Sequence, residues 1–416
     1  MLIWILQTGE PLQSDGQDVR PMRAINLSNA LVAAGHDVVL WSSDFYHQEK
    51  RHRFGENRSI HLSDSFEIRL LKSPGYKRNI GLGRLVDHAF LAYNLRNWLL
   101  SENEVPDVAF IGYPPIEAAA ILSSWLRQRN VPFLLDVKDQ WPSIFIEAIP
   151  PSLRILGRAL LSPYFYLAKR TMRDASGFST MSIGFQNWAR SFSGKSNVVD
   201  SVFPLTTVHS FVDKSDLDSA LLWWERKGVV KNKSCKICFI GSLSQAFDFK
   251  PIFLAAKKSL ESNDDVQYII CGDGEEAAKL HIMFGNLPNV IMPGWVNRSQ
   301  AVALFIMSTC AIAPYKNIPN FNSNIPNKIL DYLSFGLPIL CPLKGDVESL
   351  LSIHKAGFPP YNHLSLYQQI LVIKNDNELI EEMSLNAKNL FDNQFSFEKV
   401  YGNLVRHLEK LCSIKR

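Results

Sequence analysis

Short apolar runs alternate with longer amphipathic stretches along the whole chain. In the first half, the apolar runs predict strands near residues 2–7, 37–41, 67–71, 107–111, 132–136, 177–181 and 197–202. The stretches between them have the spacing of amphipathic helices, at 20–34, 84–100 and 115–129. In "AAGHDVVLW", Gly35 ends a helix and a fully apolar strand follows, which is typical of parallel strands covered by helices. The sequence therefore predicts an α/β fold built on parallel sheets.

This alternation is interrupted between residues 203 and 234, where a charged stretch lacks a strand. It resumes with predicted strands at 235–241, 266–274, 289–292, 310–315 and 337–342. A length of 416 residues also exceeds that of one ordinary core. We therefore predict two doubly wound Rossmann-like domains facing a central cleft. Their expected parts are residues 1–203, a linker or insertion at 204–234, residues 235–395, and a C-terminal helix within 396–416 that crosses back to the first domain.

Composition excludes several classes of protein. A net charge of +4 gives no concentrated basic surface of the kind that binds nucleic acid. The six cysteines lie mostly in apolar runs, which favours reduced thiols in a cytosolic protein, and "CKIC" (235–238) lacks the second pair that a zinc site needs. "MLIWIL" is too short for a signal peptide and reads as a first buried strand, and no apolar run approaches the ~20 residues of a membrane span.

The stretch "SNIPNKILDYLSFGLPIL" (323–340) carries the strongest indication of chemistry. Asn324 is expected to cap a helix whose first turn holds Pro326. The free N–H groups and dipole of a helix start attract phosphate, and Lys328 adds a full positive charge. Asp331, one turn further, shares that face and can accept hydrogen bonds from sugar hydroxyls. The alternative is a solvated Lys–Asp pair, although the order of Lys328 before Asp331 is the weaker one for helix stability.

Two glycine turns follow predicted strands of the second domain. "IICGDGEE" (269–276) places Gly272 and Gly274 where a strand ends, and "CFIGSLSQ" (238–245) places Gly241 and Ser242 similarly. Glycine lets a backbone approach a ligand closely, and these turns can donate to a phosphate. The alternative is a tight strand–helix turn. The dinucleotide fingerprint is incomplete because residue 277 is alanine and no acidic residue follows a second strand ~20 residues on.

In the first domain, "LLDVKDQWP" (134–142) places Asp136 and Asp139 at a strand end, followed by Trp141. A carboxylate there would face the cleft; the alternative is a surface turn in which Trp141 only fills space. Arg20 and Arg23 stand at a helix start, where their charge opposes the dipole. They indicate an anionic ligand, or else a salt bridge to Asp15 or Asp18.

A further stretch, residues 150–173, mixes large apolar side chains with five basic residues, and "HQEKRHRF" (47–54) is a second basic patch. Basic amphipathic helices dock on anionic lipid surfaces. An amphipathic helix packed on its own sheet explains the pattern of residues 150–173 equally well, so both interpretations stay open.

Together these motifs resemble the retaining glycosyltransferases of family 4, which have the GT-B fold, and most closely the branch that builds bacterial O-antigens and other surface polysaccharides. The resemblance covers nearly the whole chain, beginning with "GEPLQSDGQDVRPMRAINLSNALVAAGHDVVLWSSDFYHQEKRHRF". "DVKDQWP" is similar to that branch's Arg-Asp-Leu-Trp-Pro signature and "CGDGEE" to its Gly-Asp-Gly turn. "IPNKILDYLSFGLPIL" is similar to its Pro-x-Lys-x-x-Glu-Tyr block, the most specific of these motifs.

The resemblance implies that Lys328 binds the donor diphosphate and contributes to catalysis, and that Asp331 binds the donor ribose. It implies a catalytic, acceptor-side position for Asp139, near the reacting carbon. The expected acceptor-side residues are Arg20, Arg23, Asp139 and Trp141. The expected donor-binding residues are Gly241, Ser242, Gly272, Asp273, Gly274, Ser323, Asn324, Ile325, Lys328 and Asp331.

Three departures from the family pattern bear on the donor. The family's first glutamate falls on Ser323, and its Arg and Lys after the second domain's first strand fall on Ser242 and Gln245. The Gly-Gly loop of the first domain is replaced by "TGEP". Lys328 is therefore expected to neutralise most of the diphosphate charge.

The implied function is retaining, metal-independent hexosyl transfer without a cofactor. The co-substrate is a UDP- or GDP-linked sugar, and the acceptor is a lipid-linked (polyprenyl diphosphate) oligosaccharide of lipopolysaccharide O-antigen, capsule or exopolysaccharide synthesis. The protein is expected to be cytoplasmic and peripheral to the inner face of the cell membrane. Two alternatives stay open. A GT-B sugar-nucleotide epimerase would need converging carboxylates or histidines, and the ten histidines show no obvious grouping. A degenerate membrane-associated scaffold is the other, because of Ser323.

Overall fold

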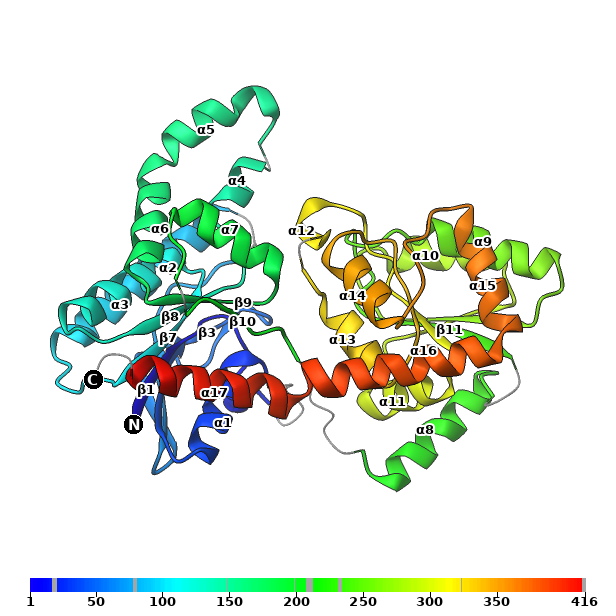
Figure 1. Ribbon diagram of the computed structural model, residues 1–416, viewed down its shortest axis with the longest axis horizontal. Helices are drawn as coiled ribbons and strands as arrows, with labels where there is room; N and C mark the ends of the chain where they lie inside the picture. Colours follow the sequence, from blue (N-terminus) through cyan, green and yellow to red (C-terminus); the bar gives the residue numbers. More distant parts are fainter. Residues whose placement is uncertain are drawn as a thin grey trace. The chain divides into compact units, whose positions relative to one another are not determined.

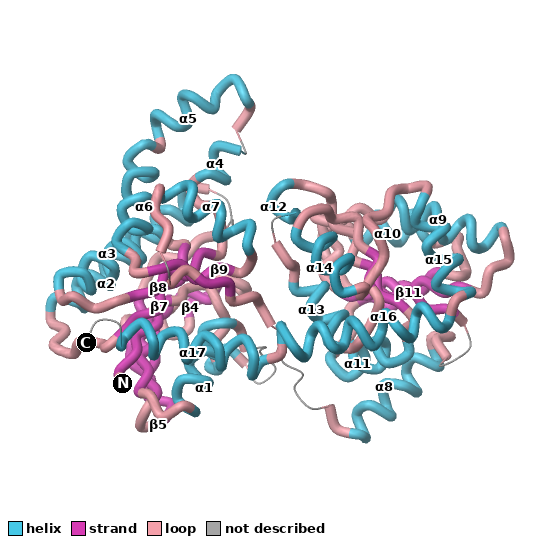
Figure 2. Tube along the Cα trace, viewed as in Figure 1, coloured by secondary structure: helices cyan, strands magenta, loops and turns pink. Residues whose placement is uncertain are grey.

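The computed structural model describes residues 1–16, 21–77, 81–147, 149–197, 199–206, 212–230, 234–322 and 324–413. The chain forms two compact units, Met1–Pro204 with Val400–Arg416, and Leu205–Lys399 (Figure 1). Each unit has its own sheet and its own hydrophobic core, and helices flank both sheets (Figure 2). The prediction of parallel sheets wound by helices is confirmed.

The sheet of the first unit has eight strands among the described residues, in the order β10-β9-β8-β7-β1-β2-β6-β5. All neighbours are parallel except β5 and β6. The strands are β1 (Leu2–Leu6), β2 (Asp37–Ser43), β5 (Arg58–Ser63), β6 (Phe66–Leu71), β7 (Val108–Tyr113), β8 (Phe133–Val137), β9 (Gly177–Thr180) and β10 (Ser201–Val202). The sequence did not predict β5, whose largely exposed side chains form no apolar run, nor the short pair β3 (Phe45–Tyr46) and β4 (Arg51–His52).

Tryptophan rings pack against one another in the core of the first unit. The ring of Trp4 lies 5.3 Å from that of Trp41 and 5.1 Å from that of Trp125. The helices of this unit are α1 (Arg23–Ala33), α2 (Leu82–Leu100), α3 (Ile116–Gln128), α4 (Ser143–Glu147), α5 (Arg154–Leu160), α6 (Ser162–Asp174) and α7 (Ile183–Ser193).

The C-terminal helix α17 (Phe397–Ser413) contributes its residues from Val400 onward to the first unit. Leu404 and Leu408 on its apolar face are completely buried. On its polar side, Glu409 accepts at 2.9 Å from His36 Nε2, and His407 Nε2 lies 2.8 Å from the Val199 carbonyl oxygen. The helical spacing of its apolar residues therefore serves to cover this unit.

In the second unit, five parallel strands lie in the order β13-β12-β11-β14-β15 among the described residues. They are β11 (Cys235–Ile240), β12 (Val266–Cys271), β13 (Val290–Gly294), β14 (Cys310–Ile312) and β15 (Ile339–Leu340). The helices are α8 (Lys214–Arg226), α9 (Lys250–Glu261), α10 (Ala277–Phe284), α11 (Arg298–Met307), α12 (Pro319–Asn322), α13 (Asn327–Ser334), α14 (Asp346–His354), α15 (Ser365–Asn375) and α16 (Asn377–Leu390).

Helix α8 lies within the segment that the sequence predicts as a linker or insertion. Trp224 on this helix is completely buried, and its Nε1 donates to the Gln300 carbonyl on α11 at 2.8 Å. This part of the segment is therefore built into the second unit.

All six cysteines lie among the described residues as free thiols. Burial raises the pKa of Cys238 to about 12, so the thiolate that metals and electrophiles require is scarce at neutral pH. In the described part of the chain, no helix combines the length and apolar character that crossing a membrane requires.

Candidate functional site

Lys328, the second residue of α13, reaches the carboxyl end of the central strand β11. Its Nζ donates to the Ile240 carbonyl at 2.6 Å and lies 5.0 Å from the centre of the Phe239 ring. A Cβ atom on Gly241 would lie 1.5 Å from this Nζ. Only glycine at position 241 therefore leaves room for the ammonium group at the strand end.

The charge of Lys328 is only partly compensated. Among the described residues, the hydrogen-bond partner of Nζ is the Ile240 carbonyl, and no carboxylate forms an ion pair with it. Burial lowers the pKa of Lys328 to about 8, against a smaller opposing effect of the Asp331 charge. Because an ammonium group has three N–H donors, two are left for an anion.

The two glycine turns pack directly against each other. Gly272 has a φ of +138°, and a Cβ there would lie 1.8 Å from the Gly241 carbonyl oxygen. Gly274 has a φ of +149°, and its Cβ would lie 2.6 Å from the Leu243 oxygen. Backbone bonds join the turns, from Gly241 N to Cys271 O and from Leu243 N to Asp273 O. Close packing of two turns thus requires these glycines, and the packed turns lie at the same sheet edge as Lys328.

The start of α13 differs from the prediction. The helix begins at Asn327, and Pro326 occupies the N-cap position. The Asn324 side chain accepts from the next backbone N–H, that of Ile325, at 2.8 Å. The prediction that Asn324 caps the helix is therefore wrong. Ile325 is partly buried against the core of the unit, and Ser323 lies outside the described residues.

The remaining predicted donor residues lie at or near this edge of the sheet. Ser242 and Asp273 are exposed on the two turns, and the Asp273 carboxylate accepts from Gly274 N at 2.7 Å. Asp331 is partly buried on α13. Sequence reasoning missed Tyr332, whose buried hydroxyl lies 3.4 Å from Ile240 N and 3.3 Å from the Ile312 oxygen. The sequence signal that could have identified Tyr332 is its position directly after Asp331. Through these two contacts Tyr332 joins α13 to the ends of β11 and β14.

In the first unit, Arg23 is a core residue. Its Nη2 donates to Asp136 Oδ1 at 2.9 Å and to Ser179 Oγ at 3.0 Å, and its Nη1 donates to the Phe203 carbonyl at 2.9 Å. Both charged side chains of the pair are at most 1 % exposed. The structure therefore corrects the acceptor-side prediction for Arg23, because its guanidinium is enclosed by protein.

The salt bridge from Arg23 to Asp15, which the sequence analysis left open, is also absent among the described residues. Asp15 pairs with Arg53 at 2.6 Å instead. Arg20 and Asp18 lie outside the described residues.

Trp141 packs inside the first unit. Its ring lies 4.6 Å from the Phe145 ring and 5.6 Å from that of His88, and the Arg84 guanidinium lies 4.8 Å from its centre. Only 5 % of the residue is exposed. The space-filling alternative therefore describes Trp141 better than an acceptor contact.

Asp139 lines a pocket of about 220 Å³ in the first unit, close to the carboxyl ends of β1, β7 and β8. Of the ionisable residues that line this pocket, Asp139 is the one to which the sequence analysis gave a functional role. The histidines show no obvious grouping in the sequence, but two of them, His47 and His88, line this pocket. The other ionisable side chains of the lining are Glu10, His47, Tyr76, Arg84, Asp87, His88 and Lys138.

Both histidines of this pocket are neutral at pH 7. Burial and the neighbouring Lys50 and Arg84 charges lower the pKa of His47 to about 4, and burial together with Arg84 lowers that of His88 to about 3. His47 Nδ1 lies 2.5 Å from the Tyr76 hydroxyl and 3.1 Å from Lys50 Nζ. Because an ammonium group can only donate, the Lys50 contact favours the tautomer in which Nδ1 accepts and Nε2 carries the proton.

The carboxylates of the pocket differ in their surroundings. Burial raises the pKa of Asp139. Glu10 accepts from Lys138 Nζ and, at 2.8 Å, from Ala24 N near the start of α1. Neutral imidazoles, carboxylates and cations in one small pocket are suited to binding polyhydroxylated ligands.

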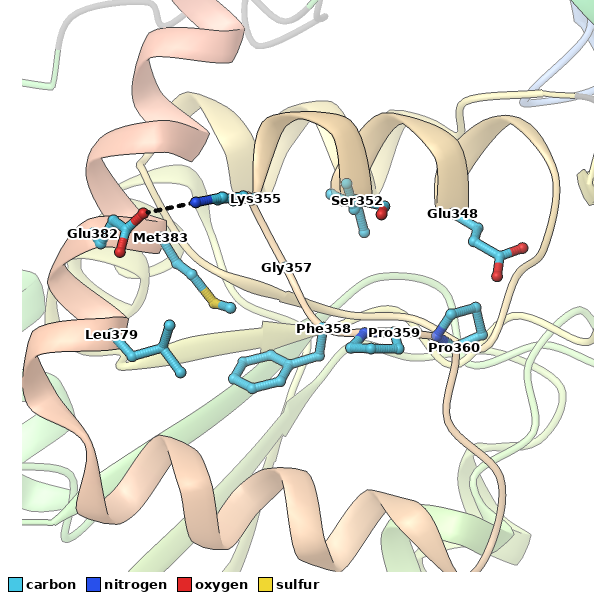
Figure 3. Close-up of a pocket in the computed structure, with 11 residues that line it drawn as sticks. Glu348, Ser352, Lys355, Gly357, Phe358, Pro359, Pro360, Leu379, Glu382 and Met383 are labelled. Carbon is cyan, nitrogen blue, oxygen red and sulfur yellow. Dashed lines mark ion pairs between the residues drawn. The ribbon is translucent and has the colours of Figure 1, made fainter.

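A pocket of about 370 Å³ lies in the second unit between α14 and α16 (Figure 3). Phe358, Leu379 and Met383 supply much of its apolar lining, and Lys355 pairs with Glu382 at 3.7 Å across one end. It includes none of the predicted donor residues, so we assign it no part in the chemistry.

Known proteins share parts of this sequence and its fold. Residues 224–390 match the family described as glycosyl transferases group 1, a range that includes Lys328 and both glycine turns. No curated protein matches the chain in sequence.

Solved structures match the whole chain. Alr3699/HepE of Anabaena with UDP-glucose is 15% identical, with a TM-score of 0.62, and the alignment covers 99% of this chain and 100% of that one. The fold is GT-B. WaaG, a glycosyltransferase involved in lipopolysaccharide biosynthesis, is 12% identical, with a TM-score of 0.63 and coverage of 98% and 99%. The lipopolysaccharide outer core galactosyltransferase WaaB is 13% identical, with a TM-score of 0.61 and 99% coverage of both chains.

The prediction of a GT-B fold is thus confirmed. The domain match and the fold support a place in the GT-B glycosyltransferase superfamily. Among the residues that the structure describes, no group of three histidine, cysteine or acidic side chains is arranged to hold a metal ion.

Proposed function

We propose that this GT-B protein is a retaining hexosyltransferase of family 4 that acts in bacterial surface polysaccharide synthesis. It moves a sugar from a UDP- or GDP-linked donor to a hydroxyl of a lipid-linked oligosaccharide. The single observation that carries the proposal is Lys328, a partly buried ammonium at the carboxyl end of β11 with N–H donors to spare.

On the donor side, the leaving group is a nucleoside diphosphate. Its charge would be met by Lys328 together with the free N–H groups and dipole at the start of α13. Such preorganised stabilisation is often the largest contribution to catalysis, so the transfer needs no divalent metal. Asp331, one turn along the same helix, would accept from the donor ribose.

On the acceptor side, the pocket around Asp139 would bind the sugar that receives the new bond. In the proposed step the acceptor oxygen attacks the anomeric carbon from the face that the diphosphate leaves. A new C–O bond forms as the bond to the diphosphate breaks, and the leaving phosphate oxygen takes the acceptor's proton. Asp139 would orient the acceptor hydroxyl and stabilise the positive charge that develops on the sugar ring.

The neighbours support the classes of substrate. Alr3699/HepE was crystallised with UDP-glucose, and WaaG and WaaB are both connected with lipopolysaccharide. We extend these properties to this chain as part of the proposal, with the protein peripheral to the cytoplasmic face of the membrane.

A panel of nucleotide-sugars tests the proposal. One donor and its nucleoside diphosphate are expected to raise the unfolding temperature, because a ligand at a hundred times its Kd stabilises the native state by about 2.7 kcal/mol. Free nucleoside diphosphate should then appear only when that donor and a lipid-linked acceptor are both present. Isomerisation of the donor without an acceptor would instead identify an epimerase, for which His47 and His88 in one pocket are the favouring observation. Absence of both stabilisation and release would indicate a scaffold.

A further inference from the structure

Helix α5 leaves its apolar side chains in solvent. Residues 151–160, all within the described part of the chain, include no buried side chain. Ile155 is 84% exposed, Leu160 79% and Leu156 68%. Figure 1 shows α5 projecting from the rest of the first unit, beyond α4 and α6. The next helix, α6, in contrast buries Ala168 and Met172. Of the two interpretations of this stretch, packing on the unit's own core therefore holds for α6 and fails for α5.

The faces of α5 are chemically distinct. Gly157 faces the protein, since a Cβ there would lie 2.8 Å from Ile149 Cδ1 and 3.4 Å from Ile146 Cδ1. At 100° per residue, Ile155 points away from that side and Leu156 and Leu160 occupy one flank. The other flank holds Arg154 and Arg158. The helix thus presents an apolar surface bordered by two guanidinium groups.

The stretch that contains this helix is basic, although the exposed Glu147 at the end of α4 lies nearby, its backbone carbonyl accepting from Arg154 at 3.3 Å. Between residues 148 and 173 the sequence contains no aspartate or glutamate, and its basic residues are Arg154, Arg158, Lys169, Arg170 and Arg173. Arg158 is exposed, whereas Arg154 also holds the preceding turn by donating to the Ile149 carbonyl at 3.2 Å. Exposed aliphatic side chains bordered by cations are complementary to the boundary between anionic headgroups and acyl chains.

We propose that α5 docks this protein on the surface of a bilayer that contains anionic phospholipids. Ile155, Leu156 and Leu160 enter the interface, and Arg158 meets the lipid phosphates. This inference rests on the proposed function, because docking on a bilayer would bring the enzyme to the surface at which a lipid-linked acceptor is presented. The docking itself needs neither donor nor acceptor.

Sedimentation of the full-length protein with vesicles tests this inference. We expect binding to vesicles of equal parts phosphatidylcholine and phosphatidylglycerol, and much weaker binding to phosphatidylcholine alone. Leu156→Ser with Leu160→Ser should weaken binding to the anionic vesicles at least about tenfold, since both side chains lose their apolar area. Arg158→Glu changes the charge by two units and should weaken it about thirtyfold, with the loss reduced at high salt.

Matched control variants distinguish binding through α5 from non-specific adsorption to vesicles. Ile155→Ser should weaken vesicle binding, whereas Ile282→Ser on α10, where the isoleucine is 82% exposed, should leave it unchanged. Arg96→Glu on α2 is the control for the charge reversal, because Arg96 is also exposed. All of these side chains are exposed, so the variants should keep the parental unfolding temperature.

Three results would overturn the inference. The first is a parental protein that stays in the supernatant with anionic vesicles, and the second is equal loss of binding in the control variants. The third is self-association without vesicles that the Leu156 and Leu160 changes abolish, which would make α5 a contact between copies of the chain. Because no donor is present, failure here leaves the nucleotide-sugar panel to decide the proposed function separately.

Discussion

Replacing Lys328 by methionine is expected to lower the rate of sugar transfer about a hundredfold and, at the same time, to stabilise the folded protein. The rate falls because a charge-assisted hydrogen bond to the leaving diphosphate, ~1.5–3 kcal/mol, is removed. The free energy of unfolding rises because the charged form of Lys328 is less favourable in the folded protein than in the unfolded chain. Its pKa is lowered to about 8 from an ordinary 10.5.

The sign of the stability effect follows from that shift. Below pH 8 the folded protein carries the full cost of a partly desolvated cation, and the cost disappears as the pH rises from 8 towards 10.5. At pH 7, Lys328→Met should therefore raise the free energy of unfolding by about 1–3 kcal/mol, as measured by urea denaturation. A lysine that costs stability and is nevertheless present is best explained by its ligand.

Lys236→Met is the matched control. Lys236 is 1% exposed at the other end of the same strand, burial lowers its pKa, and its Nζ donates to the Ser234 carbonyl at 3.0 Å. Its replacement should leave the transfer rate close to the parental value. A folded Lys328→Met protein with near-normal transfer would count decisively against the donor site.

Asp139→Asn is expected to lower turnover by a hundredfold or more while the donor still binds. The substitution keeps the shape of the side chain and removes its charge from a pocket where burial already raises the pKa of the acid. Loss of one preorganised group that stabilises charge in the transition state typically costs about 10²–10³ in rate. Since the residues proposed to bind the donor lie in the second unit, the thermal shift produced by the nucleoside diphosphate should be unchanged.

This pattern distinguishes the two sites. Lys328→Met should lose both the thermal shift and the turnover, whereas Asp139→Asn should lose only the turnover. Parental turnover in Asp139→Asn, or loss of its thermal shift, would show that Asp139 does not act on the acceptor side.

The elements that sequence predicted well are those whose signal is local. The strands at 235–240 and 266–271 are largely apolar runs that end in glycine turns, so both the strands and the sheet edge that carries the turns could be predicted. Lys328 could be predicted because its position in the first turn of a helix, two residues after a proline, is itself a local feature. The GT-B fold followed from the order of such elements and from the family motifs.

The elements that sequence predicted poorly depend on distant partners. Arg23 looked like an anion ligand because its charge opposes the dipole of α1, and its true partner, Asp136, is 113 residues away. The pocket around Asp139 draws its other ionisable groups from segments between Glu10 and Lys138, and no spacing rule connects these. Asn324 failed as a cap for a local reason, because its side chain bonds the next N–H and the helix starts three residues later.

The central claim, that the donor diphosphate binds beside the ammonium of Lys328, is tested most directly by the pH dependence of nucleoside diphosphate affinity. Calorimetry between pH 7 and 10 on the parental protein should show affinity that is nearly constant up to about pH 8 and then falls about tenfold per pH unit, because the free lysine loses its proton there. Lys328→Met should bind more weakly at every pH and lack this decline. The same decline in both proteins, or equal affinity in both at pH 7, would contradict the account.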